Sequence, residues 1–157
     1  AAANVKSGGG RIGFSLSDTF CVERHKQAFL DLFGRDIDIL LTNFAEAQAL
    51  LDATDMDGVI AAMQGAGVDG AITCGAEGAV IVHAGEAVRV GAVGVQTVTD
   101  LTGAGDQFAA GYLCGVARGR DAQTCGRMGA LAAAEVIQHF GPRPEKDLRA
   151  VFAEHGL

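Results

Sequence analysis

The sequence has no tryptophan, one tyrosine and two prolines among its 157 residues. No apolar run reaches the roughly 18–20 residues of a membrane-crossing helix, so no membrane span is expected. The 12 lysines and arginines are scattered, and the formal net charge is −7. Proteins that bind nucleic acid through its phosphates carry a basic face, so this function class is not expected here.

Cysteine is scarce as well, with four residues and no CxxC pair. Cys21, Cys74, Cys114 and Cys125 each lie in an apolar or helical stretch, which favours buried thiols over disulfides or a zinc site. No targeting segment is recognised in the sequence, and we expect a cytoplasmic location.

What the chain does contain is apolar and small residues. Hydrophobic residues make up 49% of the sequence, charged residues 20%, and glycine accounts for 23 positions. This composition indicates one folded domain with tight loops and close backbone packing. The chain opens on Ala1 in what reads as the tail of a helix before the glycines at positions 8–10. We therefore expect a truncated piece of a longer protein.

Hydrophobic periodicity and capping residues divide the chain into alternating strands and helices. We predict strands at residues 11–15, 37–41, 71–74, 79–83 and 87–90, and helices at residues 19–33, 43–51, 58–64, 106–118, 122–140 and 145–155. Such alternation predicts an α/β fold of three layers, with a mostly parallel sheet covered by helices on both faces.

The strongest local pattern is residues 100–111, which read DLTGAGDQFAAG. Residues 103–105 form a loop of small residues that leads directly into an apolar helix. Free backbone N–H groups and the positive end of the helix dipole meet there, which makes an anion site. Asp106 lies in the first turn, where the dipole favours a negative charge. Amide donors beside a carboxylate suit phosphoryl transfer to a hydroxyl group.

A simpler interpretation is an aspartate that caps a helix after a glycine turn. The helix that follows argues against it, because Phe108, Tyr112 and Val116 predict burial on most of its faces. A carboxylate beside a buried helix needs a partner or a function.

The same segment resembles the C-terminal signature of PfkB (ribokinase-like) carbohydrate and nucleoside kinases, D-x-T-G-A-G-D-x-F-x-x-G. The matching positions are Asp100, Thr102, Gly103, Ala104, Gly105, Asp106, Phe108 and Gly111. The resemblance implies that the amides of Gly103, Ala104 and Gly105 form the anion hole for the transferred phosphoryl group. It also implies that Asp106 is the base that takes the proton of the substrate hydroxyl.

A second element, Asn43-Phe-Ala-Glu46, follows the predicted strand at residues 37–41. By itself, N-x-x-E is usually a helix cap followed by a surface glutamate. It is similar to the family's N-x-x-E motif, which implies that Asn43 and Glu46 organise Mg²⁺, its waters and the phosphates. Hard cations prefer oxygen ligands and often act through water.

A third element is the sequence TCGAEG at residues 73–78, similar to the family's strand-end T-x-G-x-x-G. The resemblance implies that Thr73, Gly75, Ala76 and Gly78 line the nucleotide. A hairpin turn between two strands explains the glycines equally well, and both interpretations hold together.

Residues 132–144 resemble the last helix and glycine turn of the family. In some members, this region and the residues before the GAGD segment hold a monovalent cation such as K⁺ through backbone carbonyls. The matching positions are Asp100, Thr102 and Gly141, whereas Pro142 departs from the small residue common in the family.

The resemblance extends over residues 11–157 and covers only the C-terminal portion of the ribokinase-like fold. It implies ATP and Mg²⁺ as cofactors, a sugar or nucleoside as substrate, and the absent N-terminal half as a partner; a homodimer stays open. Residues 14–18 and 21–25 look most like the adenosine-kinase-like branch. The segments that bind the acceptor have no counterpart here, so we expect no turnover by this chain alone.

Two alternatives remain. A non-catalytic nucleotide-binding module would share every ATP-related feature. A nicotinamide-dependent oxidoreductase would rest on the G-x-G-x-x-G at residues 65–70. That fingerprint requires a strand before the glycines and a helix after them, and here the predicted order is reversed.

Overall fold

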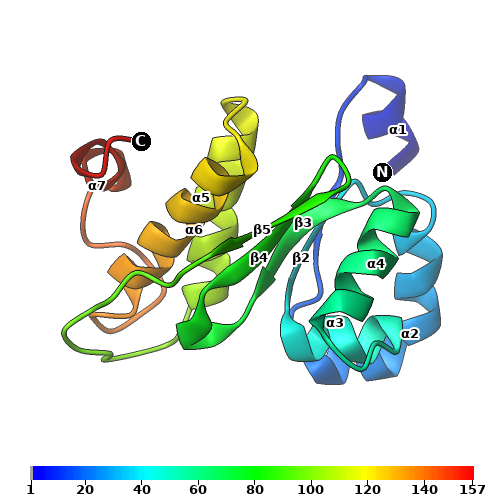
Figure 1. Ribbon diagram of the computed structural model, residues 1–157, viewed down its shortest axis with the longest axis horizontal. Helices are drawn as coiled ribbons and strands as arrows, with labels where there is room; N and C mark the ends of the chain where they lie inside the picture. Colours follow the sequence, from blue (N-terminus) through cyan, green and yellow to red (C-terminus); the bar gives the residue numbers. More distant parts are fainter. Residues whose placement is uncertain (1) are drawn as a thin grey trace. The chain divides into compact units, whose positions relative to one another are not determined.

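The computed structural model describes residues 2–157, which divide into two compact units (Figure 1). Residues 2–72 and 82–87 form the first unit, and residues 73–81 and 88–157 form the second. The strand order in the five-stranded sheet is β1-β2-β3-β4-β5. The family-like α/β class is confirmed.

The first unit alternates strands with helices. Its elements are α1 (Ala2–Ser7), β1 (Gly13–Ser15), α2 (Thr19–Phe33), β2 (Ile39–Asn43), α3 (Phe44–Leu51), α4 (Met56–Ala66) and β3 (Asp69–Thr73). Strands β1 and β2 are parallel, with Phe14 opposite Leu40. Helices α2, α3 and α4 lie on the same side of β2 and β3 (Figure 1).

The sheet is mixed, which corrects the prediction of a mostly parallel one. Strand β4 (Ala79–His83) follows β3 after the short helix η1 (Gly75–Glu77), and β5 (Glu86–Val90) follows β4 after two residues. Those two residues, Ala84 and Gly85, have φ of 50° and 81°. Positive φ at both central positions is typical of the tight turn of an antiparallel hairpin. The prediction of helices on both faces of one sheet stays a prediction.

Helix α2 begins and ends where its sequence predicts. The Asp18 carboxylate accepts a hydrogen bond of 2.7 Å from the Cys21 amide, and Gly34 forms the C-cap. Val22 and Phe33 are buried, and Phe29 packs edge-on against Phe14. Phe20, although apolar and in the same helix, is 67% exposed.

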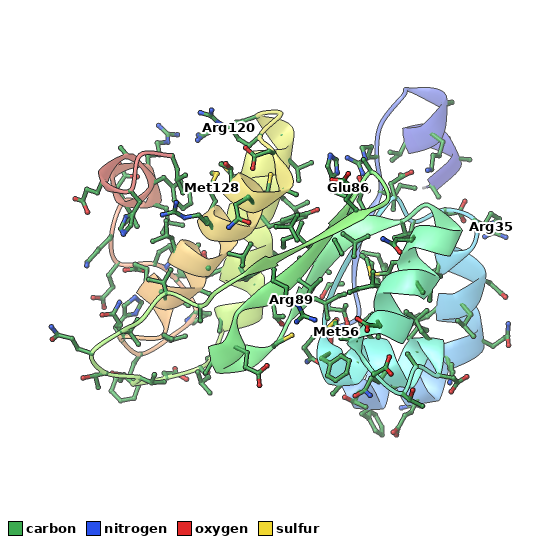
Figure 2. All side chains as sticks on the ribbon, in the orientation of Figure 1. Arg35, Met56, Glu86, Arg89, Arg120 and Met128 are labelled. Atoms are coloured by element: carbon green, nitrogen blue, oxygen red, sulfur yellow. The ribbon has the colours of Figure 1, made fainter. Side chains whose placement is uncertain are left out.

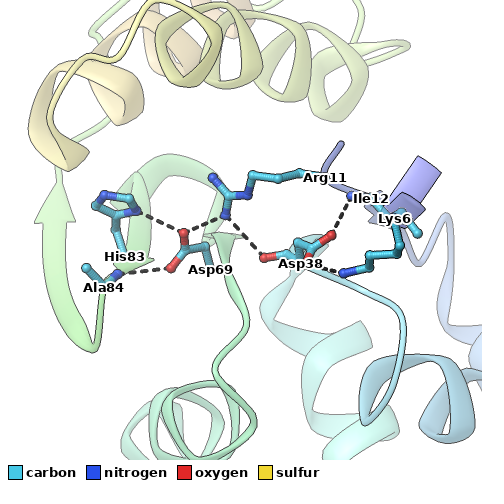
Figure 3. A network of polar contacts seen from close by, with 7 residues as sticks. All are labelled: Lys6, Arg11, Ile12, Asp38, Asp69, His83 and Ala84. Carbon is cyan, nitrogen blue, oxygen red and sulfur yellow. Dashed lines mark hydrogen bonds and ion pairs between the residues drawn. The ribbon is translucent and has the colours of Figure 1, made fainter. Parts of the chain in front are cut away.

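A network of charged side chains ties together the N-terminal segment and the starts of β2 and β3 in the first unit (Figure 3). Asp38 accepts hydrogen bonds from Lys6 Nζ and, at 2.6 Å, from the Ile12 amide. Asp69 Oδ2 lies 2.6 Å from Arg11 Nη2 and 3.0 Å from His83 Nδ1, and Asp69 Oδ1 accepts from the Ala84 amide at 2.9 Å.

The contribution of this network to stability can be tested at Asp69, because the side chain of Asp69 is only 17% exposed. Burial raises the pKa of Asp69, but the Ala84 amide, Arg11 and His83 outweigh burial and hold this pKa below its usual value. A carboxylate with a depressed folded-state pKa stabilises the protein fully above about pH 4 and loses that effect as the pH falls through the folded-state value.

We expect Asp69→Asn to lower the free energy of unfolding by about 1–2 kcal/mol at pH 7, because three donors lose an ionised acceptor. The difference from the unchanged protein should shrink between about pH 5 and pH 2. Urea unfolding at several pH values measures it, with the exposed Asp31→Asn as control. A difference that stays constant down to pH 3 would contradict the role given to the Asp69 charge.

The second unit contains η1, the first part of β4, the last part of β5 and three helices, α5 (Ala104–Ala117), α6 (Ala122–Val136) and α7 (Leu148–Glu154). One cluster of its core joins Met128, Leu131 and Ala132 of α6 to Phe152 of α7. Residues 91–103, which lead to the GAGD loop, carry no helix or strand.

Helices α5 and α6 approach each other through glycines. Figure 2 shows Arg120 in the turn between them and Met128 on α6. A Cβ added to Gly111 would overlap the backbone carbonyl of Met128, and one added to Gly129 would come within 2.9 Å of the Phe108 carbonyl oxygen. The contact is therefore largely backbone against backbone, and any larger residue would push the helices apart.

Several predicted boundaries are wrong by a few residues. Helix α4 begins at Met56 with Asp55 as its cap, because the Asp55 carboxylate accepts from the Gly58 amide at 2.8 Å. The predicted start was residue 58. Helix α6 ends at Val136 instead of residue 140, and α7 spans Leu148–Glu154 instead of 145–155.

All four cysteines are thiols in the structure, as predicted. Only Cys125 is buried, however, and the expected burial is wrong for Cys21, Cys74 and Cys114, which are partly exposed. Burial raises the pKa of the Cys125 and Cys74 thiols. Among residues 2–157, none of the helices combines the length and the apolar character needed to cross a membrane.

Candidate functional site

The predicted anion loop stands at the start of α5. Gly103 is the N-cap with φ of 80°, a left-handed conformation that glycine adopts without strain. The Ala104 amide donates to the Leu101 carbonyl at 3.1 Å, and the Gln107 amide donates to the Gly103 carbonyl at 2.8 Å. The amides of the first turn otherwise lack partners within the helix, so this turn can bind an anion.

Asp106 lies in the first turn of α5 and is exposed to solvent. The helix behind it is buried at Phe108, Gly111, Tyr112 and Gly115, whereas Ala110 is exposed. The predicted burial on most faces is therefore wrong for the face that carries Asp106 and Ala110. An exposed carboxylate beside the free amides of one helical turn could accept a proton from a bound hydroxyl group.

The residues before the anion loop are held by Asp100. Its carboxylate accepts from the Gly141 amide at 3.0 Å, from the Thr102 amide at 2.9 Å and from the Thr102 hydroxyl at 2.7 Å. These three donors hold the pKa of Asp100 below its usual value. The structure thus brings Asp100, Thr102 and Gly141 together, the three positions suggested for a monovalent cation, but it joins them by hydrogen bonds to a side chain.

Pro142 fixes the other side of the loop. A Cβ added to Gly103 would lie 2.6 Å from the Cβ of Pro142, so the proline ring packs directly on the Gly103 backbone. The Gln107 side chain donates to the Pro142 carbonyl at 3.0 Å. The departure from the family pattern at position 142 therefore places a rigid residue against the first residue of the anion loop.

A cavity of about 600 Å³ opens within the second unit beside this loop. Three groups of residues line it: Thr73, Gly75, Ala76 and Gly78 around η1; residues 92–95, 98 and 101 of the irregular segment; and Ala104, Gly105, Phe108, Ala130, Ala133, Ala134 and Ile137 of α5 and α6. Among these lining residues, Thr73 has the one polar side chain. The size and apolar walls of the cavity suit a flat aromatic group such as a nucleobase.

The cavity joins two predicted elements that lie about thirty residues apart. Every residue predicted to line a nucleotide around η1 faces it, and so do Ala104 and Gly105 of the anion loop. Gly103 and Asp106 are not among its lining residues. Its irregular wall at residues 92–98 was not predicted; the small residues of Gly91-Ala-Val-Gly94 were the available signal.

Asn43 and Glu46 lie in the first unit and form a complete capping box at the start of α3. Asn43 Oδ1 accepts from the Glu46 amide at 2.9 Å, and Glu46 Oε2 accepts from the Asn43 amide at 3.0 Å. The Asn43 side-chain amide donates to Glu46 Oε1 at 2.6 Å, and the Thr42 hydroxyl lies 3.2 Å from Oε2. Glu46 is only 6% exposed, so it is not the surface glutamate of an ordinary cap.

These contacts constrain how the pair could hold Mg²⁺. Glu46 Oε2 already accepts from the Asn43 amide and the Thr42 hydroxyl, whereas Oε1 accepts from the Asn43 side chain and has a further lone pair. Direct coordination would compete with the capping box, whereas a hydrated Mg²⁺ could be bound through its waters. The residues therefore fit a magnesium ion that keeps its hydration shell.

Asn43→Ala should lower the free energy of unfolding by about 0.5–2 kcal/mol through loss of the N-cap. Asn43→Ser is the matched control, because a serine oxygen can still accept from the Glu46 amide, whereas the variant lacks the side-chain amide group that donates to Glu46 Oε1. If Asn43 also organises Mg²⁺, the serine variant should regain stability without regaining Mg²⁺-dependent ATP binding in calorimetry. Recovery of both stability and Mg²⁺-dependent ATP binding would mean that Asn43 acts only as a helix cap.

Glu135 and His139 were not among the predicted site residues. Glu135 lies in the last turn of α6 and is 5% exposed. Its carboxylate accepts from the amides of Glu145 and Lys146 at 3.1 and 3.0 Å, and His139 Nε2 lies 3.3 Å from each of its oxygens. The available signal was a glutamate four residues before a histidine at the end of an otherwise apolar helix.

Known proteins resemble this chain over most of its length. The family model for pfkB family carbohydrate kinases matches residues 9–148. A cytidine kinase of Thermococcus kodakarensis is 29% identical over 137 residues, which cover 85% of this chain and 49% of that protein.

Solved structures give the same result. A probable sugar kinase of Rhizobium etli CFN 42 matches with a TM-score of 0.94 and 37% identity, over 99% of this chain and 47% of that one. An adenosine kinase of Sinorhizobium meliloti matches with a TM-score of 0.93 and 38% identity, over 99% and 48%. The chain therefore spans about half the length of these relatives.

Proposed function

This chain belongs to the pfkB family of carbohydrate kinases, and from that membership we propose that it is the nucleotide-binding and catalytic part of an ATP-dependent phosphotransferase. The acceptor is a hydroxyl group of a sugar or a nucleoside. The observation that carries the proposal is the cavity shared by the η1 segment and the start of α5, where an apolar chamber adjoins a ready anion site.

In this proposal the nucleobase occupies the apolar cavity, and the phosphates extend toward the first turn of α5. The amides of residues 103–105 bind the phosphoryl group as negative charge develops on it. Ala104 contributes less than the motif suggests, because its amide already donates to Leu101. Asn43 and Glu46 would hold a hydrated Mg²⁺ ion through its waters, and the ion would supply positive charge that neutralises the phosphates.

Asp106 takes the proton from the acceptor hydroxyl. An ionised aspartate is a weak base for an alcohol, but a loose transition state lets the proton leave late, when the hydroxyl has become far more acidic. The exposure of Asp106 supports this role, because an acceptor can approach it from solvent. A monovalent cation bound by carbonyls near Asp100, Thr102 and Gly141 would adjoin the same loop.

The identity of the acceptor is a more specific proposal. The relatives include proteins named as cytidine, adenosine and sugar kinases, and two nucleoside kinases. We favour a nucleoside such as adenosine, from the resemblance of residues 14–18 and 21–25 to that branch and the 38% identity to an adenosine kinase. The full-length protein, assayed against nucleosides and sugars, decides between these classes.

A second candidate is nucleotide binding without transfer. It is favoured by one observation: the cavity and the anion loop both lie within the second unit. Saturable Mg-ATP binding by a full-length protein that phosphorylates none of the acceptors would support this candidate over the kinase.

Filling the cavity tests the nucleotide site directly. We expect Ala133→Trp to weaken Mg-ATP binding by about tenfold or more, because the indole would occupy space that the base needs and burial of a base-sized apolar group is worth about 1.5–3 kcal/mol. Titration calorimetry measures the affinity. Ala150→Trp on the exposed surface of α7 is the control. Equal affinity of both variants would show that the base binds elsewhere.

A further inference from the structure

Glu135 occupies a position that its own helix disfavours. A carboxylate in the last turn of α6 faces the negative end of the helix dipole, and burial adds a desolvation cost. Two backbone amides and His139 offset that cost. Locally unfavourable residues with such dedicated partners concentrate at functional sites.

The two amides that Glu135 binds end a short, stiff loop. Both prolines of the chain, Pro142 and Pro144, lie in the four residues just before Glu145. Proline fixes its own φ near −65° and restricts the residue before it, so residues 141–144 have little conformational freedom. Residues 141–144 therefore form a rigid connection between the amides bound by Glu135 and the residues that contact Gly141 and Pro142.

The other end of this connection touches the anion loop. Pro142 packs on the Gly103 backbone, its carbonyl accepts from Gln107, and the Gly141 amide donates to Asp100. Residues 100 and 103 flank the turn that sets the directions of the first amides of α5. A displacement of Pro142 would therefore move the amides that face the proposed phosphoryl group.

We propose that Glu135 is a positioning residue, which holds the loop at residues 141–146 against Gly103 and so fixes the geometry of the anion loop. The proposal rests on the proposed function only for its kinetic consequence; the mechanical link between Glu135 and Gly103 stands on contacts within the second unit. His139 Nε2 lies 3.3 Å from both oxygens of the same carboxylate and helps to hold it.

The first test compares Glu135→Ala with Glu135→Gln in the full-length protein. The alanine variant should exchange the backbone amides of residues 145–146 and of residues 102–105 at least about tenfold faster, because its loop is unanchored. With Mg-ATP and adenosine, kcat should fall by about 10–100-fold while KM for ATP changes by less than about threefold, as expected for a small misplacement of groups that act in the transition state.

Glutamine keeps an oxygen for the two amides, so Glu135→Gln should restore most of the exchange protection and of kcat. Asp121→Ala is the matched control: it removes a carboxylate cap from the opposite end of α6. It should lower stability without changing kcat or selectively exposing residues 102–105. Faster exchange confined to residues 141–146, with kcat unchanged, would overturn the proposal.

Pro142→Gly tests the same link from the other end, and it keeps the question open to refutation if Glu135→Ala does not fold. Exchange at residues 102–105 should rise while residues 145–146 stay protected, and the two substitutions together should cost less than the sum of their effects on kcat. Full additivity would contradict a path through Pro142. If the unchanged protein phosphorylates neither adenosine nor other acceptors, the proposed function fails, and amide exchange still decides the positioning role.

Discussion

Asp106→Asn in the full-length protein is expected to lower kcat by about 10²–10⁴-fold, the usual contribution of a positioned general base. Asparagine has nearly the same shape and keeps the helix, but it cannot accept the proton of the acceptor hydroxyl. The affinity for Mg-ATP should change by less than about threefold, because the cavity that receives the base does not include Asp106. Steady-state kinetics and calorimetry on the same preparation separate the two quantities.

Asp57→Asn is the matched control for this experiment. Asp57 is an exposed aspartate in the first turn of α4, as Asp106 is in the first turn of α5. Both substitutions remove a negative charge from a helix N-terminus, so both should cost similar stability. Only Asp106→Asn should reduce turnover. Retained turnover in that variant would remove Asp106 from the role of base.

Gly111→Ala should lower the free energy of unfolding by about 2–3 kcal/mol, although alanine normally favours a helix over glycine. The added methyl group would overlap the Met128 backbone carbonyl, and a backbone cannot rotate away as a side chain can. Helices α5 and α6 must then separate. The first turn of α5 would move with its helix, so we also expect weaker Mg-ATP binding.

Gly65→Ala supplies the comparison within a helix. Gly65 lies in α4, and a Cβ added there meets nothing within 4 Å. That substitution should leave stability unchanged or raise it by up to about 1 kcal/mol. Urea unfolding of the two variants measures both effects. Equal stability of Gly111→Ala and Gly65→Ala would mean that the close approach at Met128 is not maintained in solution.

The accuracy of the sequence predictions followed how local each signal was. Helix α2 was predicted to the residue because Asp18 caps it and Gly34 ends it. The predicted end of α6 was four residues too late. The Thr99 amide donates a hydrogen bond of 2.8 Å to the Ile137 carbonyl, and this contact joins positions far apart in the sequence. The exposure of Phe20 escaped the pattern for a related reason: periodicity does not say which apolar side chains find a neighbour.

The candidate site divides in the same way. Residues 103–106 and 73–78 are contiguous motifs, and their local geometry at the start of α5 and around η1 is close to what the sequence predicts. The roles assigned to them stay predictions. The cavity wall at residues 92–98 and the contact of Glu135 with residues 145–146 depend on tertiary packing. The sequence signals for both, small residues at 91–94 and a glutamate four residues before a histidine, do not say which distant residues they contact.

The glycine contact between α5 and α6 also has a consequence for how this protein can diversify. At an ordinary core position, several apolar residues of similar volume are interchangeable, and drift proceeds in small steps. At Gly111 and Gly129 every substitution adds at least a methyl group beside a backbone atom of the other helix. If every amino acid is tested at these two sites, almost only glycine should give a folded protein. Leu131, which lies in α6 with Gly129, should tolerate methionine or isoleucine. Substitutions that change the spacing of α5 must therefore be matched by changes in α6. The position of the anion loop at the start of α5 is constrained by the same requirement.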